Sequence, residues 1–248
     1  MSLAASNLIA HRGDSTDLPE NSLAAVRSAL ALGVGFVEVD IQFCRDQVPV
    51  LLHDLSLNRT TNIDQRIVDV DWSEAQTFSI AEPNRLSGSQ QAYLPQLSQL
   101  VTLIHEWPDR TFLIEIKEES LACAERDVLL NIIHQTTLPV QSQCIFICYD
   151  ADVLRYLRTR SDTPIGLILR LWDEAHLQTL DHLKPEYILC NHQKLPKDLT
   201  QLPQAPGLWA FYEVKDLSTA KYLQQLGATL IETRNPGKLM RADQHAHT

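Results

Sequence analysis

Hydrophobic and polar residues alternate along residues 36–43, which read FVEVDIQF. A period of two is typical of a β-strand, because successive side chains on a strand point to opposite faces. Val37 and Val39 therefore share one face, and the carboxylates of Glu38 and Asp40 point together from the other. Adjacent carboxylates are strongly unfavourable in a protein interior unless a cation compensates them. The strand therefore predicts a divalent cation site.

A second apolar run, PVLL at residues 49–52, follows a short polar turn and ends in His53 and Asp54. Apolar runs on both sides of such a turn predict two antiparallel strands. The returning strand brings His53 back to the level of Glu38 and Asp40. An imidazole and two carboxylates are thus expected in one neighbourhood.

Strand-like and helical patterns alternate along the rest of the chain. The strand patterns begin near residues 8, 37, 112, 143, 165, 187, 208 and 229, and the helical patterns cover 23–34, 97–104, 123–135, 151–160, 173–183 and 217–226. Such alternation over 248 residues indicates a single α/β domain spanning residues 1–248, a (β/α)8 TIM barrel. A doubly wound open sheet is the alternative. It is disfavoured because HRGD, at residues 11–14, stands where a glycine-rich dinucleotide turn would follow the first strand.

Two segments break this rhythm. Residues 54–94 are polar, with one short helical signal at 72–78. Loops of that length are usually functional lids or small inserted subdomains, so we expect an insertion after His53 and Asp54. The polar end of the chain, RADQHAHT at residues 241–248, is predicted to be disordered, with no ligand role for its histidines.

Composition limits the partners of this chain. The net charge is −10 and no two basic residues are adjacent, which disfavours nucleic acid and anionic membrane surfaces. No window approaches 18 apolar residues and the first residues lack a basic stretch, so neither a membrane span nor a signal peptide is expected. The sequence predicts a cytoplasmic monomer or homodimer that acts on a small molecule.

The cysteines are five in number and scattered, mostly among apolar residues. An odd, scattered set predicts buried, reduced thiols rather than a disulfide framework. A zinc site is not expected either, because no Cys-x2-Cys pair has a histidine partner at ligand spacing.

In a TIM barrel, functional groups lie at the carboxyl ends of the strands. The predicted strand ends carry His11, Arg12, Glu38, Asp40, Glu115, Lys117, Asn191, His192, Trp209 and Tyr212. Three carboxylates with room for water suit Mg²⁺ or Ca²⁺ better than zinc. Two cationic side chains suit a phosphate, and paired histidines suit acid–base catalysis. Together these groups indicate metal-assisted cleavage of a phosphate ester.

The motifs also carry a family resemblance. Residues 9–61 contain HRG, PENS, E-x-D, PV, HD and RTT in that order, followed later by LPQLSQLV at 94–101 and EIK at 115–117. This series resembles the signature of the glycerophosphodiester phosphodiesterase family. A weaker resemblance continues through YILCNH, LWAFY and GATLIETRNP, so it covers nearly the whole chain.

The resemblance implies a barrel with an insert after HD and a metal-dependent hydrolysis of glycerophosphodiesters to sn-glycerol 3-phosphate and an alcohol. The implied roles are a divalent cation, Mg²⁺ or Ca²⁺, at Glu38, Asp40 and Glu115, acid–base catalysis by His11 and His53, and phosphate binding by Arg12 and Lys117. Two routes fit these residues, direct attack by water and attack by the glycerol 2-hydroxyl through a cyclic phosphate.

Several residues have a structural interpretation beside the functional one. Asn21 or Ser22 is expected to cap the first helix. Glu20 is expected to hydrogen-bond within the site, and we assign it to substrate or phosphate binding. Trp209 is either barrel core or a wall of the glycerol pocket, and we assign it to substrate binding. Lys117 has Glu118 and Glu119 as alternative partners on the surface.

Departures from the family pattern concern the last two strands. Trp209-Ala210-Phe211-Tyr212 stands where the family has W-T-V-N, and Glu232-Thr233-Arg234-Asn235 where it ends in T-D. Ile63 replaces a glycine after RTT-N. These changes leave two alternative functions open, a lysophospholipase D that cleaves a lipid phosphodiester and a barrel that binds a phosphodiester without cleaving it. The thin apolar set of the insert disfavours the former, and the intact histidines and acids disfavour the latter.

Overall fold

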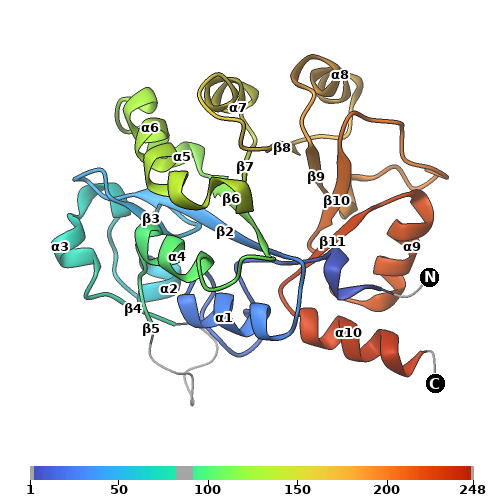
Figure 1. The fold of residues 1–248 in the computed structure, drawn as a ribbon, viewed down its shortest axis with the longest axis horizontal. Coiled ribbons are helices and arrows are strands. Elements are labelled where there is room, and N and C mark those ends of the chain that lie inside the picture. The colour runs from blue at the N-terminus through green and yellow to red at the C-terminus, as the bar shows by residue number, and fades with distance from the viewer. Residues whose placement is uncertain (1–2, 82–91, 247–248) are drawn as a thin grey trace.

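A closed parallel barrel forms the centre of the molecule in the computed structural model, which describes residues 3–81 and 92–246. Its strands are β1 (Leu8–Ala10), β2 (Phe36–Phe43), β6 (Thr111–Ile116), β7 (Cys144–Cys148), β8 (Ile165–Leu169), β9 (Tyr187–Asn191), β10 (Leu208–Tyr212) and β11 (Leu230–Thr233). The barrel closes because β1 pairs in parallel with both β11 and β2 (Figure 1). The predicted (β/α)8 TIM barrel is confirmed.

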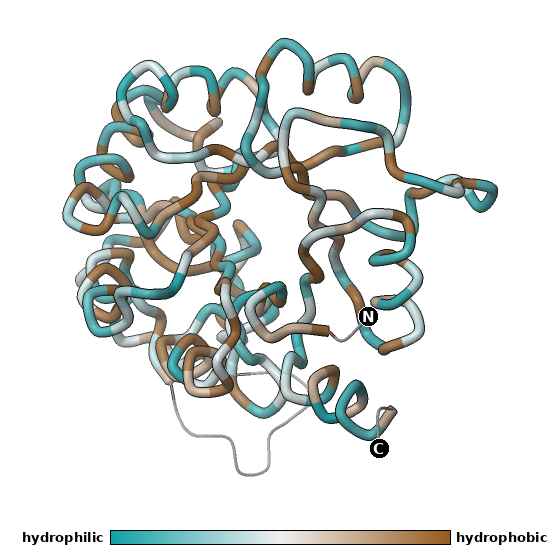
Figure 2. The backbone as a smooth tube through the Cα atoms, turned by 45° about the vertical axis from the view of Figure 1, so that its right-hand side comes forward, coloured by the Kyte–Doolittle hydropathy of each residue, from teal (hydrophilic) through white to brown (hydrophobic). Residues whose placement is uncertain are grey.

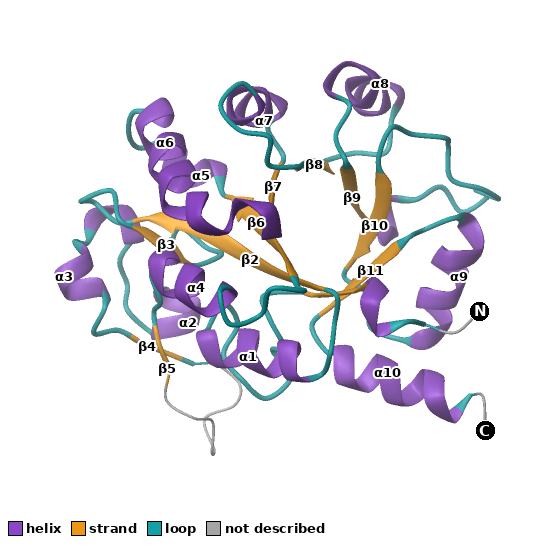
Figure 3. Ribbon diagram, in the orientation of Figure 1, coloured by secondary structure: helices purple, strands orange, loops and turns teal. Residues whose placement is uncertain are grey.

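Helices surround the strands (Figure 3). They are α1 (Leu23–Ala31), α4 (Leu97–Ile104), α5 (Glu118–Leu121), α6 (Arg126–Thr137), α7 (Ala151–Arg158), α8 (Glu174–Leu183), α9 (Leu217–Leu226) and α10 (Pro236–His245). The larger core lies between strands and helices and includes Val37, Val39 and Ile41. A smaller apolar cluster, which includes Ile9, Leu113 and Leu230, comes from the alternate, inward positions. Hydrophobic segments accordingly follow the strands in Figure 2, and hydrophilic ones follow the outer helices and loops.

The first turn of the barrel explains the HRG motif. Ser22 caps α1, since its hydroxyl accepts a hydrogen bond from the backbone nitrogen of Ala25 at 3.0 Å. Gly13 has a φ of +79°, and a Cβ at this position would lie 2.6 Å from the carbonyl carbon of Ala25. Only glycine permits this close approach between the β1 loop and α1.

The insert packs as a small subdomain beside the barrel. Strand β3 (Pro49–Leu51) runs antiparallel to β2, and after it come α2 (Asn58–Thr61), a 3-10 turn at Ile67–Asp69, α3 (Trp72–Ala75), β4 (Ser79–Ile80) and β5 (Ala92–Tyr93). Leu57, Ile67 and Ala75 are fully buried in its own hydrophobic cluster. Residues 82–91, which include Pro83 and Gly88, lie outside the described part of the chain.

The prediction of a disordered end was wrong for residues 241–245, which belong to α10. Asp243 is buried, and its carboxylate accepts a hydrogen bond from the Leu3 backbone nitrogen at 2.7 Å and lies 3.1 Å from the Lys221 ammonium. These long-range partners stabilise a polar helix whose local sequence carries few apolar residues. His247 lies outside the described residues.

The thiols are free, as predicted. Cys44, Cys144, Cys148 and Cys190 are buried, while Cys123 is exposed and so differs from the expectation. Within the described residues, no helix is both long enough and apolar enough to span a membrane.

Candidate active site at the carboxyl end of the barrel

Ionisable side chains converge on a cavity of about 230 Å³. Its lining consists of His11, Arg12, His53, Glu115, Lys117, Ile147, Tyr149, Ile168, Leu189, Tyr212, Glu213 and Glu232. A larger surface groove beside α8, of about 510 Å³, is lined by Trp172, Asp173 and Pro206 among others and contains no histidine, lysine or arginine. We therefore place the candidate site in the smaller cavity, where acids, bases and cations meet.

Three of the predicted carboxylates lie together at the carboxyl ends of β2 and β6. Asp40 is directly opposite Glu115 in the pairing of these strands, and Glu38 is on the same face of β2. One oxygen from each of the three carboxylates lies within 4.8 Å of the others. Glu38 and Asp40 are almost fully buried, so bulk water does not neutralise their charge. The clustering expected from the alternation of β2 is confirmed.

Asp40 is the best-satisfied member of this cluster. Its Oδ2 atom accepts a hydrogen bond from Asn21 Nδ2 at 2.8 Å and lies 3.0 Å from Arg12 Nε. Burial alone would raise the pKa of Asp40, but the charge of Arg12, followed by those of His53 and Lys117, lowers it below its usual value. Asp40 is therefore ionised.

Asn21 was predicted to be a helix cap, and the structure assigns it another task. Its φ is +56°, and its Oδ1 atom accepts a hydrogen bond from the Asp40 backbone nitrogen at 3.0 Å. The amide thus pairs with both the backbone and the side chain of Asp40, while Ser22 provides the cap. Asn21 fixes the orientation of this carboxylate.

Glu38 and Glu115 are less completely compensated. Glu38 Oε2 accepts a hydrogen bond from the Arg12 backbone nitrogen at 2.8 Å, whereas its Oε1 atom has no hydrogen-bond partner among the described residues. Burial, followed by repulsion from Asp40, raises the pKa of Glu38 well above its usual value. The same causes raise the pKa of Glu115 to about 7, against the opposing charge of Lys117.

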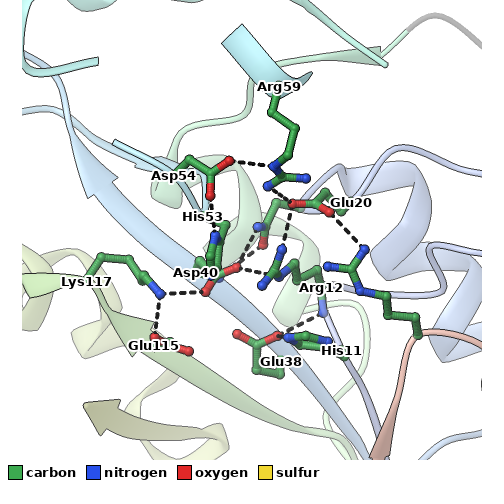
Figure 4. A network of polar contacts seen from close by, with 12 residues as sticks. His11, Arg12, Glu20, Glu38, Asp40, His53, Asp54, Arg59, Glu115 and Lys117 are labelled. Carbon is green, nitrogen blue, oxygen red and sulfur yellow. Dashed lines mark hydrogen bonds and ion pairs between the residues drawn. The ribbon is translucent and has the colours of Figure 1, made fainter. Parts of the chain in front are cut away.

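Lys117 lies inside this cluster (Figure 4). Its ammonium donates a hydrogen bond to Glu115 Oε1 at 2.7 Å and lies 3.7 Å from Asp40 Oδ1. The surface partners considered from the sequence are not used, because Glu118 pairs with Arg170 instead. Lys117 is therefore buried between two carboxylates rather than exposed.

The cluster has the donor set of a divalent cation site. Over residues 3–81 and 92–246, one buried oxygen of Glu38 and one of Asp40 have no hydrogen-bond partner, and the Glu115 carboxylate lies beside them. All three donors are hard oxygens, the ligands that Mg²⁺ and Ca²⁺ prefer. The residues present therefore fit the cation that the sequence predicted.

Both histidines line the same cavity. Burial and the neighbouring Arg12 charge lower the pKa of His11 well below its usual value, so its imidazole is neutral at neutral pH. His53 Nδ1 lies 2.5 Å from Asp54 Oδ1, and its carbonyl oxygen accepts a hydrogen bond from Gln42 Nε2 at 3.0 Å. The contact with Asp54 orients the His53 ring, and the contact with Gln42 holds the His53 backbone.

Glu20 forms ion pairs with three arginines (Figure 4). Its carboxylate oxygens lie 2.8 Å from Arg12 Nη1, 2.6 Å from Arg59 Nη2 and 3.2 Å from Arg234 Nη1. Burial opposes ionisation, yet hydrogen bonding to Arg59 and the charges of the arginines lower the pKa of Glu20 to about 2. Arg59 also contacts Asp54 Oδ2 at 2.5 Å, so the insert is tied to the barrel and to His53.

Trp209 does not lie where we expected it. It is 5% exposed in the layer between strands and helices, where its ring packs 5.3 Å from that of Trp172 and its Nε1 donates to the Pro203 carbonyl. Along β10 the inward positions alternate with Trp209, which leaves Tyr212 to line the cavity. The assignment of Trp209 to the substrate pocket is therefore wrong.

Further cavity residues were missed or underrated from the sequence. The hydroxyl groups of Tyr212 and Tyr149 are hydrogen-bonded at 2.9 Å. Glu232 also lines the cavity, because it is two positions after the inward-facing Leu230. Burial, followed by repulsion from Glu115 and then Asp40, raises the pKa of Glu232 well above its usual value. The signal for Glu232 was present, since an alternating strand end with a carboxylate had already identified Glu38.

Comparison with known proteins agrees with this geometry. Glycerophosphodiester phosphodiesterase 1 of Bos taurus is 30% identical over 172 residues, which are 68% of this chain and 50% of that protein. A glycerophosphodiester phosphodiesterase of Caldanaerobacter subterraneus is 34% identical over 115 residues, 46% of this chain and 45% of that protein. The alignments thus span about half the length of these curated relatives.

Solved structures share the fold over nearly the whole chain. A phosphodiesterase of Oleispira antarctica, in complex with the product sn-glycerol-3-phosphate, has a TM-score of 0.81 at 20% identity, covering 96% of each chain. A Silicibacter pomeroyi structure described as a glycerophosphoryl diester phosphodiesterase has a TM-score of 0.84 at 17% identity, covering 99% of this chain and 94% of that one. The Glycerophosphoryl diester phosphodiesterase family model matches residues 11–238. The chain belongs to the glycerophosphoryl diester phosphodiesterase family.

Proposed function

We propose that this chain hydrolyses glycerophosphodiesters to sn-glycerol 3-phosphate and an alcohol, with a divalent cation held by Glu38, Asp40 and Glu115. The observation that carries the proposal is that these three carboxylates cluster at a cavity lined by Glu115 and by both histidines. Family membership supports it, and the Oleispira antarctica relative was solved with this product bound.

The cation supplies charge for the phosphoryl oxygens and lowers the pKa of a hydroxyl when it is bound, a task for Mg²⁺ or Ca²⁺. Arg12 and Lys117 line the same cavity and add two cationic donors for the phosphate. Glu20 holds the Arg12 guanidinium from behind, through the 2.8 Å contact to Nη1. The proposed phosphate site is therefore formed by Arg12 and Lys117, whose side chains are held in place by their ion pairs with Glu20 and Glu115.

Proton transfer falls to the two histidines. His11 is neutral, so its imidazole can accept a proton from the attacking hydroxyl. As an imidazolium, His53 donates Nδ1–H to Asp54, which orients its Nε2–H for proton transfer to the leaving alcohol. The same pair serves direct attack by water and attack by the glycerol 2-hydroxyl through a cyclic phosphate.

A turnover assay tests the proposal. Metal-free protein is supplied with Mg²⁺ or Ca²⁺. Release of glycerol 3-phosphate is measured from glycerophosphocholine and glycerophosphoethanolamine, and release of acylglycerol 3-phosphate is measured from a lysophospholipid. We expect turnover of the two water-soluble diesters that stops when a chelator is added. Preference for the lysophospholipid would identify a lysophospholipase D, and binding of every substrate without turnover would contradict hydrolysis.

A further inference from the structure

We propose that a second divalent cation site, formed by His11, Glu38 and Glu232, adjoins the first and shares Glu38 with it. One ligand atom from each of these three side chains lies within 4.8 Å of the others. The three residues come from neighbouring strands, because β1 pairs with β11 on one side and with β2 on the other. The backbone nitrogen of His11 also donates to the Thr233 carbonyl at 2.9 Å, which fixes His11 beside Glu232.

Polar atoms of this site are buried without hydrogen-bond partners in the part of the chain that the structure describes. His11 is 6% exposed and Glu38 is 1% exposed, and there neither His11 Nδ1 nor Glu38 Oε1 has a hydrogen-bond partner. His11 Nε2 lies 3.9 Å from Glu38 Oε2, beyond hydrogen-bond distance. Glu232 is 3% exposed, and within residues 3–81 and 92–246 its carboxylate is engaged in no ion pair. A buried acid without a counter-ion beside a buried imidazole whose Nδ1 makes no hydrogen bond is the arrangement that a cation completes.

The basic side chains of the site are engaged elsewhere. Arg12 directs its guanidinium to Glu20 and Asp40, and Lys117 directs its ammonium to Glu115 and Asp40. Neither forms an ion pair with Glu232 within the part of the chain that the structure describes. The Glu232 carboxyl group is thus left as a ligand for an ion that the chain itself does not supply.

The donor sets of the two sites select different metals. Glu38, Asp40 and Glu115 offer oxygen alone, which suits Mg²⁺ or Ca²⁺. His11 adds an imidazole nitrogen to the second site, and mixed nitrogen and oxygen donors favour ions such as Zn²⁺ over Mg²⁺. The second site therefore takes a nitrogen-accepting cation beside the oxygen-bound one.

Occupation of the second site has a consequence that rests on the proposed function. A neutral imidazole has one nitrogen lone pair that accepts either a proton or a metal. Zn²⁺ bound to His11 removes the lone pair that proton transfer needs. We expect Zn²⁺ to inhibit the Mg²⁺-supported enzyme.

Zinc counting tests the site without any assay of turnover. The full chain is dialysed to equilibrium against Zn²⁺ with excess Mg²⁺, and bound zinc is counted in the wild type and in Glu232→Gln. Glu213→Gln is the matched control, because Glu213 lines the same cavity but is not in the donor set. We expect one fewer zinc ion in Glu232→Gln than in both other proteins, and equal counts in the wild type and Glu232→Gln would overturn the site.

A second variant guards against an effect of folding. His11→Gln should lose the same zinc ion, and thermal unfolding checks that each variant remains folded. In the turnover assay, Zn²⁺ should inhibit the wild type at least tenfold. Full turnover with the additional zinc bound would overturn ligation by His11, whereas absence of turnover with Mg²⁺ alone would contradict the proposed function and leave the zinc count to decide the site.

Discussion

Two sides of the active site bury carboxylates to a similar degree and compensate them in opposite ways. On one side Glu20 is 4% exposed and contacts three arginines, and its pKa falls to about 2. On the other side Glu115 is 9% exposed, accepts a hydrogen bond from the Lys117 ammonium, and its pKa rises to about 7. Because both carboxylates are buried, the nearby charges explain the difference: three arginines lower the pKa of Glu20, whereas repulsion from Asp40 raises that of Glu115.

This contrast separates a closed structural network from an incomplete one. The network around Glu20 joins the β1 loop, the insert and the β11 loop through Arg12, Arg59 and Arg234. It needs no added ion. The three acids of β2 and β6 have two cations nearby, Arg12 and Lys117, and within the described residues Glu38 Oε1 has no hydrogen-bond partner, so this is the side at which we propose a metal.

The largest effect is expected from Glu38→Gln, which removes a charged ligand from the incomplete side. Loss of a group that only hydrogen-bonds to a metal ligand reduces metal affinity about 10-fold to 100-fold. Loss of Glu38, a proposed ligand itself, should therefore weaken Mg²⁺ binding and turnover by more than about 100-fold. Calorimetric titration of Mg²⁺ and release of glycerol 3-phosphate measure both. Glu106→Gln, which alters an exposed ion pair to Arg27, should change neither. Unaltered Mg²⁺ affinity in Glu38→Gln would remove the proposed cation from this site.

On the compensated side, Glu20→Gln should destabilise the fold. The pKa of Glu20 falls from 4.5 to about 2, which corresponds to about 3 kcal/mol. Because the folded-state pKa is lowered, this stability is present above pH 4.5 and is lost as the pH falls from 4.5 to about 2. Urea unfolding between pH 7 and pH 3 should show that the free energy of unfolding of the wild type falls with pH. Glu20→Gln should lack the part of this pH dependence that comes from Glu20. Parallel pH curves for the two proteins would mean that the arginines do not stabilise the carboxylate.

Glu115 should show the opposite pH dependence in metal-free protein. Its folded-state pKa is raised from 4.5 to about 7, so its contribution to stability is complete below pH 4.5 and is lost as the pH rises to about 7. The loss is up to about 3 kcal/mol. Thermal unfolding of chelator-treated protein measures it, with Glu115→Gln as the comparison. Addition of Mg²⁺ should restore stability at pH 7, and an equal response in Glu115→Gln would contradict the ligand assignment.

Sequence patterns predicted what is local in this molecule. The alternation in β2 placed Glu38 and Asp40 on one inward face, and EIK placed Glu115 beside them, because strand periodicity depends only on neighbouring residues. The turn at 44–48 returned His53 to the same cavity for the same reason.

Contacts between distant segments were not predictable in this way. Asn21 is a residue type that often caps helices, but its side chain hydrogen-bonds to Asp40, which is 19 positions later in the chain. The pairing of β11 with β1 brings Glu232 beside His11. Helix α10 is held to distant segments through Asp243 and its contacts with Leu3 and Lys221. A local sequence pattern does not indicate which distant residues will be in contact.

The smallest expected effect concerns the outermost arginine of the closed network. Arg234 has a half-exposed side chain and the longest of the three contacts to Glu20, at 3.2 Å, whereas Arg12 is buried. Ion pairs that water reaches contribute about 1 kcal/mol or less, so Arg234→Gln should reduce the free energy of unfolding by no more than this. Urea unfolding at pH 7 measures it, together with the double variant Glu20→Gln/Arg234→Gln. If Arg234 acts through Glu20, its substitution should have no further effect in the double variant, and additive losses would instead show that the β11 loop is held independently of the network.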